Sequence, residues 1–167
     1  MSIRDYLQGR SVRFSIVLHR PAPTATKLAH CVHVSGTRVA KAVLVRLGGV
    51  GSYALAVLPA THRIDLQRFD ALLGVVGSAI AREAEVESTF PDCECGALPP
   101  FGRLYGLPTV VDASLVGVPE IVFDANSRFE GVRMELRDYL QIELPTVGEF
   151  ARRVAPKHPR TSHRRAG

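Results

Sequence analysis

Two apolar runs, the first rich in β-branched residues, are separated by a glycine-rich turn and constrain the fold of this chain more than any other feature. Val39 to Leu47 forms the first run, Tyr53 to Leu58 forms the second, and Gly48-Gly49-Val50-Gly51 lies between them. Such a pair is typical of a β-hairpin. The sequence therefore predicts a sheet around this hairpin, with the other segments packed against it.

Helical and strand patterns are mixed along the rest of the chain without strict alternation. Apolar spacing predicts helices over residues 1–10, 25–34, 65–74 and 82–89, with a last helix around 146–153. Strand patterns cover residues 12–18, 109–112, 120–123 and 132–136. This order predicts the α+β class, with a mixed, curved sheet or partial barrel and peripheral helices. We expect one domain over residues 1–150 and a basic, disordered tail over residues 151–167.

Residues 90–108 are unlike the segments on either side of them. They contain the prolines and glycines of a stiff, irregular loop: Pro91, Gly96, Pro99, Pro100, Gly102, Gly106 and Pro108. Gly96 allows the backbone to approach a ligand closely, and the prolines remove donors and fix φ. Composition alone favours a simple connector here.

Lys41 interrupts the apolar run from Val39 to Val45. A lysine that is buried without a partner is costly, whereas an ammonium beside a phosphate or a polarised ester carbonyl is stabilised. Because Ala40 and Ala42 flank Lys41, the residues alone favour a lysine on the solvated face of a strand.

Four segments, in the same order, resemble the YbaK/prolyl-tRNA-editing family of aminoacyl-tRNA deacylases. They are Leu28 to Val45, Leu58 to Leu66, Phe90 to Leu115, and Ile121 to Ala125. The resemblance covers roughly residues 12–150, and it rests on several ordered motifs rather than on any single one.

The resemblance implies a carboxylic ester hydrolase that removes a wrongly attached amino acid from tRNA, without a cofactor or a metal. The Ala/Leu/Pro-lined loop favours a small amino acid, such as alanine, proline, serine or cysteine. The resemblance implies that Lys41 and the Gly96–Pro100 loop line one cleft, with catalytic roles for Lys41, Gly96 and Pro100. It also implies a substrate-binding set that comprises His30, Ala97, Leu98, Pro99, Phe101, Gly102 and Asp112. The expected partner is the acceptor end of an aminoacyl-tRNA. A homodimer or a contact with an aminoacyl-tRNA synthetase stays open.

The chain departs from the family pattern at two positions. Cys95 stands where proline is usual, and Arg128 stands where we expect histidine or another small polar residue. Both departures bear on substrate preference.

Charge is unevenly distributed along the chain. The net charge is +5, and six of the 21 basic residues lie within residues 152–167, which contain no acidic residue. The tail therefore either attracts a polyanion or only keeps the protein in solution. The near-neutral remainder favours recognition of the acceptor end alone.

Other functional classes fit the sequence less well. The apolar runs are too short to span a bilayer, the N-terminus is polar, and the three cysteines form no disulfide framework, so a cytoplasmic protein is expected. Cys93-x-Cys95 has no second cysteine pair, which argues against zinc. His30 and His33 either share a ligand or are one packed and one exposed histidine. A catalytically inactive module of the same fold, binding tRNA or a nucleotide for regulation, is the alternative function.

Overall fold

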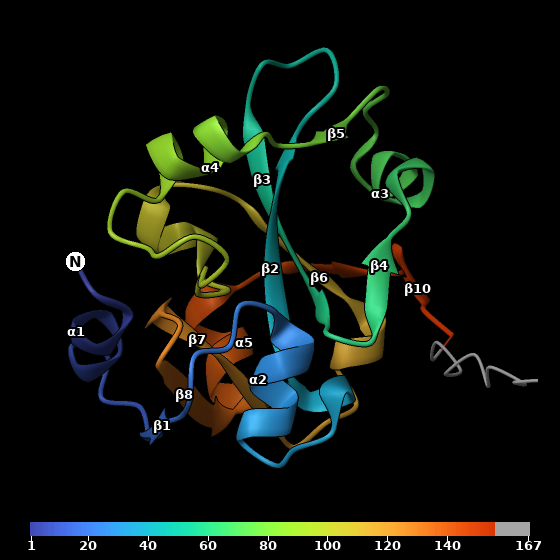
Figure 1. The fold of residues 1–167 in the computed structure, drawn as a ribbon. Coiled ribbons are helices and arrows are strands. Elements are labelled where there is room, and N and C mark those ends of the chain that lie inside the picture. The colour runs from blue at the N-terminus through green and yellow to red at the C-terminus, as the bar shows by residue number, and fades with distance from the viewer. Residues whose placement is uncertain (156–167) are drawn as a thin grey trace, which may run out of the picture.

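The computed structural model describes residues 1–155. Its largest sheet has five strands in the order β5-β2-β3-β6-β9 (Figure 1). The predicted hairpin is confirmed: β2 (Ala40–Arg46) pairs antiparallel with β3 (Tyr53–Pro59) along its whole length. β6 (Thr109–Asp112) and β9 (Thr146–Gly148) add in parallel on one side, and β5 (Ala79–Ile80) pairs antiparallel on the other.

Two smaller sheets complete the β-structure of the described residues. β1 (Phe14–Leu18), β8 (Glu130–Glu135) and β7 (Glu120–Ser127) form an antiparallel sheet, and β4 (His62–Ile64) pairs with β10 (Ala151–Arg153). A single parallel bridge between Val39 and Val122 joins the start of β2 to β7. Over residues 1–155 no sheet closes into a barrel, and the α+β class with a mixed sheet is confirmed.

Short helices lie around these sheets (Figure 1). They are α1 (Ile3–Gln8), α2 (Ala25–Cys31), α3 (Leu66–Leu73), α4 (Glu83–Thr89) and α5 (Leu136–Glu143), with 3₁₀ turns η1 (Gly36–Arg38), η2 (Gly102–Tyr105) and η3 (Ala113–Leu115). Thr24 caps α2, and Asp65 caps α3, through side chains that accept from backbone N–H groups. Within residues 1–155, every helix is too short to cross a bilayer.

The two faces of β2 contribute to different parts of the core. Ala40 and Leu44 pack into the main core, together with residues of α1, α5, β7 and β8. Val43 and Val45 pack on the opposite face, where Phe69 of α3 is buried. Because side chains alternate along a strand, Lys41 shares the face of Val43 and Val45.

The C-terminal part of the domain differs from the sequence prediction. Residues 146–153 form strands β9 and β10 instead of a helix, and residues 136–143 form α5. Residues 151–153, which the sequence assigned to the tail, form a strand that pairs with β4. The rest of that tail, residues 156–167, lies outside the described residues.

Candidate active site

Lys41 lies near the start of β2, paired with Leu58 of β3. Its side chain is half-buried, and Nζ donates a hydrogen bond to the backbone carbonyl of His62. Burial lowers the pKa of this ammonium, and the nearby charge of Arg63 lowers it further. The lysine is therefore not a freely solvated surface residue.

A pocket of about 550 Å³ opens beside Lys41. It lies between α2, the β3–β4 turn and the end of β10, and its lining comprises Thr26, Lys41, Ala60, Thr61, His62, Arg63, Arg153, Val154 and Ala155. Three basic side chains and two threonine hydroxyls line it, and no carboxylate does. Such a lining can stabilise negative charge on a phosphate or on an ester oxygen.

His62 stands beside Lys41 in this pocket. Its Nδ1 lies 2.9 Å from the hydroxyl of Thr61. Burial lowers the pKa of the imidazole; the charge of Asp112 opposes this, and the charges of Arg153 and Lys41 add to it. The result is an imidazole that is neutral at physiological pH and able to accept a proton.

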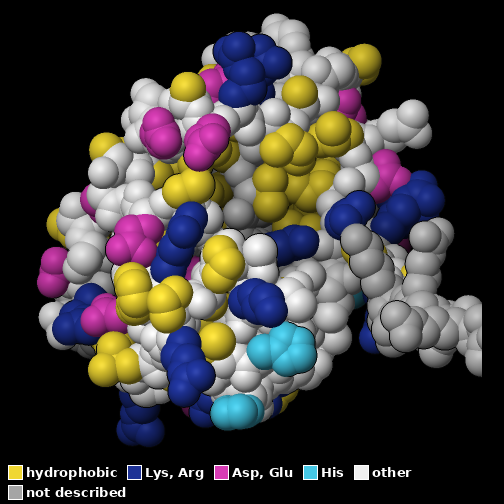
Figure 2. Space-filling view, in the orientation of Figure 1, with side chains coloured by type: hydrophobic (Ala, Val, Ile, Leu, Met, Phe, Trp, Pro, Cys, Tyr) yellow, Lys and Arg dark blue, Asp and Glu magenta, His cyan; other side chains and the backbone are white. Residues whose placement is uncertain are grey.

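His30 lines a second, adjoining pocket of about 320 Å³. This pocket shares Thr26 and Thr61 with the Lys41 pocket, and it also contains His33. His33 has a positive φ of 54°, at the end of α2. Both histidines therefore lie within one surface depression next to the lysine. Figure 2 shows a hollow near the centre of this face, with basic side chains around it and a hydrophobic patch beside it.

The second half of the loop from Phe90 to Gly102 packs into the core. Ala97, Leu98, Pro99, Pro100, Phe101 and Gly102 are all buried. The hydroxyl of Tyr139 donates to the carbonyl of Pro100 at 2.8 Å, and the backbone N–H of Gly102 donates to the Thr109 hydroxyl at 3.0 Å. These contacts fix the second half of the loop rigidly.

Gly96 is the last residue of the exposed half of that loop. Its φ is +81°, a conformation that favours glycine, and a Cβ there would lie 3.3 Å from the carbonyl oxygen of Pro23. Pro23 directly precedes Thr24, the cap of α2, and Thr26 of the first turn lines the Lys41 pocket. The loop and Lys41 therefore adjoin the same end of α2.

The loop and the lysine do not, however, line a common pocket. None of residues 96–102 contributes to the Lys41 pocket or to the His30 pocket. Leu98 and Phe101 instead pack on the Ala40 and Leu44 side of the sheet. The roles expected for Gly96 and Pro100, and for the buried residues of the loop, stay predictions.

Asp112 has both carboxylate oxygens engaged within the fold. Oδ1 accepts from the backbone N–H groups of Phe150 and Ala151 at 2.8 and 2.7 Å, and Oδ2 accepts from the N–H and the hydroxyl of Ser114. Asp112 thus anchors the start of β10, the strand that carries Arg153 into the pocket. The substrate-binding role expected for it stays a prediction.

Sequence reasoning missed several residues of this pocket, namely Thr26, Thr61, His62, Arg63 and Arg153. Thr61, His62 and Arg63 belong to a segment that already resembled the family, although no role followed from it. No sequence pattern indicated a role for Arg153, because it was assigned to the tail. Within residues 1–155, no group of three or more histidine, cysteine or acidic side chains is arranged to hold a metal ion.

Comparison with known proteins identifies the family of this chain. The model of the aminoacyl-tRNA editing domain family matches residues 19–142. The chain belongs to this family. The multifunctional Ser/Thr-tRNA deacylase ProXp-y of Escherichia coli K12 is 29% identical over 149 residues, covering 87% of this chain and 89% of the relative. The resemblance drawn from the sequence motifs is therefore confirmed.

Solved structures show the same fold. A candidate trans-editing enzyme for prolyl-tRNA synthetase superimposes with a TM-score of 0.79 at 22% identity, covering 90% of this chain and 94% of that chain. A hypothetical protein superimposes with a TM-score of 0.81 at 18% identity, covering 90% and 99%. Both likenesses extend over almost the whole domain.

Proposed function

We propose that this protein is a trans-editing deacylase that hydrolyses the ester between tRNA and serine or threonine, with Lys41 at the reacting carbonyl. Membership of the aminoacyl-tRNA editing family supports the reaction class. The observation that carries the assignment of the site is a partly buried lysine in a pocket with three basic groups and no carboxylate.

Lys41 is suited to stabilising the charge that develops during ester hydrolysis. Its Nζ is held by the carbonyl of His62, which leaves two donors for the pocket. When water attacks the ester carbonyl carbon, the carbonyl oxygen becomes an oxyanion, and a fixed donor in a desolvated pocket stabilises it. The basic side chains of Arg63 and Arg153 strengthen the positive potential there.

His62 provides a route for the proton in the same mechanism. As water attacks, its proton passes to the neutral imidazole, the bond between the carbonyl carbon and the ribose oxygen breaks, and that oxygen is protonated as it leaves. The products are a free amino acid and an intact tRNA. This step requires neither a cofactor nor a metal.

The threonine hydroxyls support a substrate that itself carries a hydroxyl. Thr26 and Thr61 line the pocket next to Lys41, and either hydroxyl can donate to or accept from a serine or threonine side chain. A site that bonds a substrate hydroxyl discriminates strongly against an analogue without one. The relative ProXp-y, a Ser/Thr-tRNA deacylase, fits this preference.

Single-turnover deacylation of separately charged tRNAs tests the proposal. Serine, threonine, alanine, proline and cysteine esters would be compared with wild-type protein, Lys41→Met and His62→Gln. We expect the serine and threonine esters to react fastest, and both variants to lose about 100-fold in rate. Equal rates for serine and alanine esters would exclude the proposed preference, and full activity of Lys41→Met would exclude this site.

A further inference from the structure

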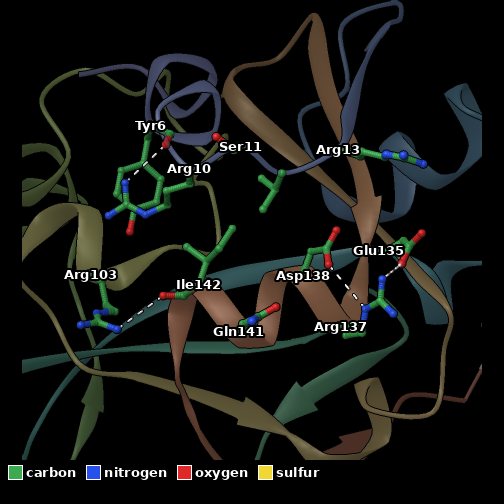
Figure 3. Close-up of a pocket in the computed structure, with 11 residues that line it drawn as sticks. Tyr6, Arg10, Ser11, Arg13, Arg103, Glu135, Arg137, Asp138, Gln141 and Ile142 are labelled. Atoms are coloured by element: carbon green, nitrogen blue, oxygen red, sulfur yellow. Dashed lines mark hydrogen bonds and ion pairs between the residues drawn. The ribbon is translucent and has the colours of Figure 1, made fainter.

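A larger pocket of about 1060 Å³ lies between the end of α1 and α5. It shares no residue with the Lys41 and His30 pockets, and Figure 3 shows the side chains around it. Its lining is mainly polar and contains four arginines, Arg10, Arg13, Arg103 and Arg137, against two carboxylates, Glu135 and Asp138. The catalytic proposal uses none of these residues.

Tyr6 and Arg10 form a fixed pair at one side of this pocket. The guanidinium carbon of Arg10 lies 3.6 Å from the centre of the Tyr6 ring, and Nη1 donates to the carbonyl of Tyr6 at 3.4 Å. Ser11 follows with a positive φ of 55°, which turns the chain sharply after Arg10. Stacking on the ring restricts the guanidinium without neutralising it.

Arg103 reaches the pocket from η2, on the same side as Tyr6 and Arg10 (Figure 3). Its Nη1 donates to the carbonyl of Ile142 at 3.4 Å. Burial raises the pKa of the Tyr6 hydroxyl, and the charges of Arg10 and Arg103 both oppose that rise. The two arginines therefore act on the same hydroxyl although they are far apart in sequence.

Within residues 1–155, the arginine side chains on this side of the pocket form no ion pair, although Glu143 lies close enough for its charge to act on Tyr6 and Arg103. Among the residues that the structure describes, Arg10 and Arg103 form no ion pair, and their side chains donate only to backbone carbonyls. Arg137, across the pocket, pairs with Glu135 at 3.1 Å and with Asp138 at 3.6 Å. One side of the pocket thus carries a phenol and two guanidinium groups without an ion pair to any described residue, and on the other side Arg137 is paired with two carboxylates.

We propose that Tyr6, Arg10 and Arg103 form a phosphate-binding site for the RNA substrate. The site binds the RNA backbone at a distance from the aminoacyl ester. The inference rests on the proposed function for the choice of RNA. Guanidinium groups present planar pairs of donors that match phosphate oxygens, and the tyrosine hydroxyl adds another donor. Such contacts position an RNA without reading its sequence.

The loop provides a physical connection between the two sites. Its exposed Gly96 lies against the residue before the α2 cap, and its buried half leads through Gly102 directly into Arg103. The arginines would add contacts to RNA phosphates beyond those made at the ester. A small number of such contacts fits a protein whose positive charge outside the C-terminal tail is balanced by acidic residues.

Binding of uncharged serine tRNA to the Arg10→Gln/Arg103→Gln double variant tests this site independently of catalysis. We expect affinity to fall about tenfold at low salt, and the slope of log K against log salt to become shallower by about two. The matched control is Arg46→Gln/Arg82→Gln, which removes the same charge at two arginines that pair with Glu85. This control should keep a wild-type slope. Tyr6→Phe, which deletes only the hydroxyl, should weaken binding by a smaller factor.

Steady-state kinetics separate this site from the catalytic one. With full-length seryl-tRNA, the double variant should show a KM raised about tenfold and an unchanged kcat. With a short seryl-CCA oligonucleotide, it should match wild type. Absence of deacylation in the wild-type protein would refute the proposed function. The tRNA-binding measurement would still show whether Arg10 and Arg103 bind phosphate.

Chemical modification covers the case in which the double variant fails to fold. In the wild-type protein, uncharged tRNA should protect Arg10 and Arg103 from phenylglyoxal, as measured by mass spectrometry, and should leave Arg82 reactive. Unprotected arginines, or an unchanged affinity and salt slope in a folded double variant, would overturn the proposal. Inorganic phosphate serves as a second probe of the site. If the double variant lost binding of inorganic phosphate but kept its affinity for tRNA, the assignment of this site to RNA would be overturned.

Discussion

Arg128 donates a hydrogen bond from Nε to the backbone carbonyl of Cys95 at 2.7 Å. These are the two positions at which we expect a departure from the family pattern, and they lie in direct contact. The backbone N–H of Arg128 also donates to the carboxylate of Glu94 at 2.7 Å. The turn after β7 therefore holds the exposed part of the loop immediately before Gly96.

Arg128→Ala should loosen this part of the loop with little effect on overall stability. The bond is charge-assisted but solvent-exposed, so we expect less than about 1 kcal/mol of lost stability. Amide hydrogen exchange should become faster in residues 93–97, and the ratio of kcat/KM between serine and alanine esters should change. Arg128→Lys is the matched variant, because it keeps the charge without the planar donors. Exchange rates that match wild type in both variants would show that the contact does not restrain the loop.

Lys41→Ala should abolish most deacylation and leave the fold intact. The side chain has one hydrogen bond, to the carbonyl of His62, so its loss should cost about 1 kcal/mol of unfolding free energy. Removing one fixed donor to an oxyanion should cost about 100-fold in rate. Thermal unfolding and single-turnover deacylation measure the two effects separately. A stable variant with wild-type turnover would show that Lys41 is not part of the reacting site.

Gly96→Ala should destabilise the loop, because alanine disfavours the backbone conformation at this position. The φ of +81° is unfavourable for any residue with a Cβ, and the added atom would lie 3.3 Å from the Pro23 carbonyl oxygen. We expect a loss of about 1–2 kcal/mol in unfolding free energy, or a local rearrangement that shifts α2. Because α2 carries Thr26 into the pocket, deacylation should slow in parallel. The same substitution at Gly74 is a control for left-handed φ alone, since its φ is +67° with no atom near the added Cβ.

Local sequence signals predicted the elements that have local causes. Thr24 and Asp65 mark helix starts because their side chains bond to N–H groups two or three residues later. The hairpin of β2 and β3 was predictable because its turn and both strands are contiguous. Lys41 stood out because it interrupts an apolar run, and the family resemblance changed its interpretation.

Elements that depend on distant partners were not predictable from local pattern. Residues 146–153 are extended because β9 pairs with β6, and β10 with β4, and both partners are far away in sequence. The same pairing sets Arg153 opposite His62, so it completes the pocket from a segment assigned to the tail. The site of Tyr6, Arg10 and Arg103 likewise exists only after α1 and η2 have packed beside α5.

Asp124→Asn should make the protein more stable at neutral and alkaline pH. Asp124 lies on β7 with 7% of its surface exposed, and its Oδ1 is buried without a hydrogen-bond partner among the described residues. Burial raises the pKa of this carboxyl to about 7, from an ordinary value of 3.8. The folded protein therefore binds a proton between about pH 4 and 7 that the unfolded chain releases. Because a carboxyl with a raised pKa favours folding only while it is protonated, the unfolding free energy falls as pH rises through this window.

The amide of the variant cannot ionise, so this fall should disappear in Asp124→Asn. Each unit of pKa shift corresponds to about 1.4 kcal/mol, so the variant should gain up to roughly 4 kcal/mol over wild type at pH 8 and little at pH 4. Urea unfolding at a series of pH values measures both curves. Glu120→Gln is the control, because Glu120 is a partly exposed carboxylate on the same strand that pairs with Arg38. A wild-type protein whose stability does not fall between pH 4 and 7, or an Asn variant with the same pH profile, would show that Asp124 is ionised in the folded state without cost.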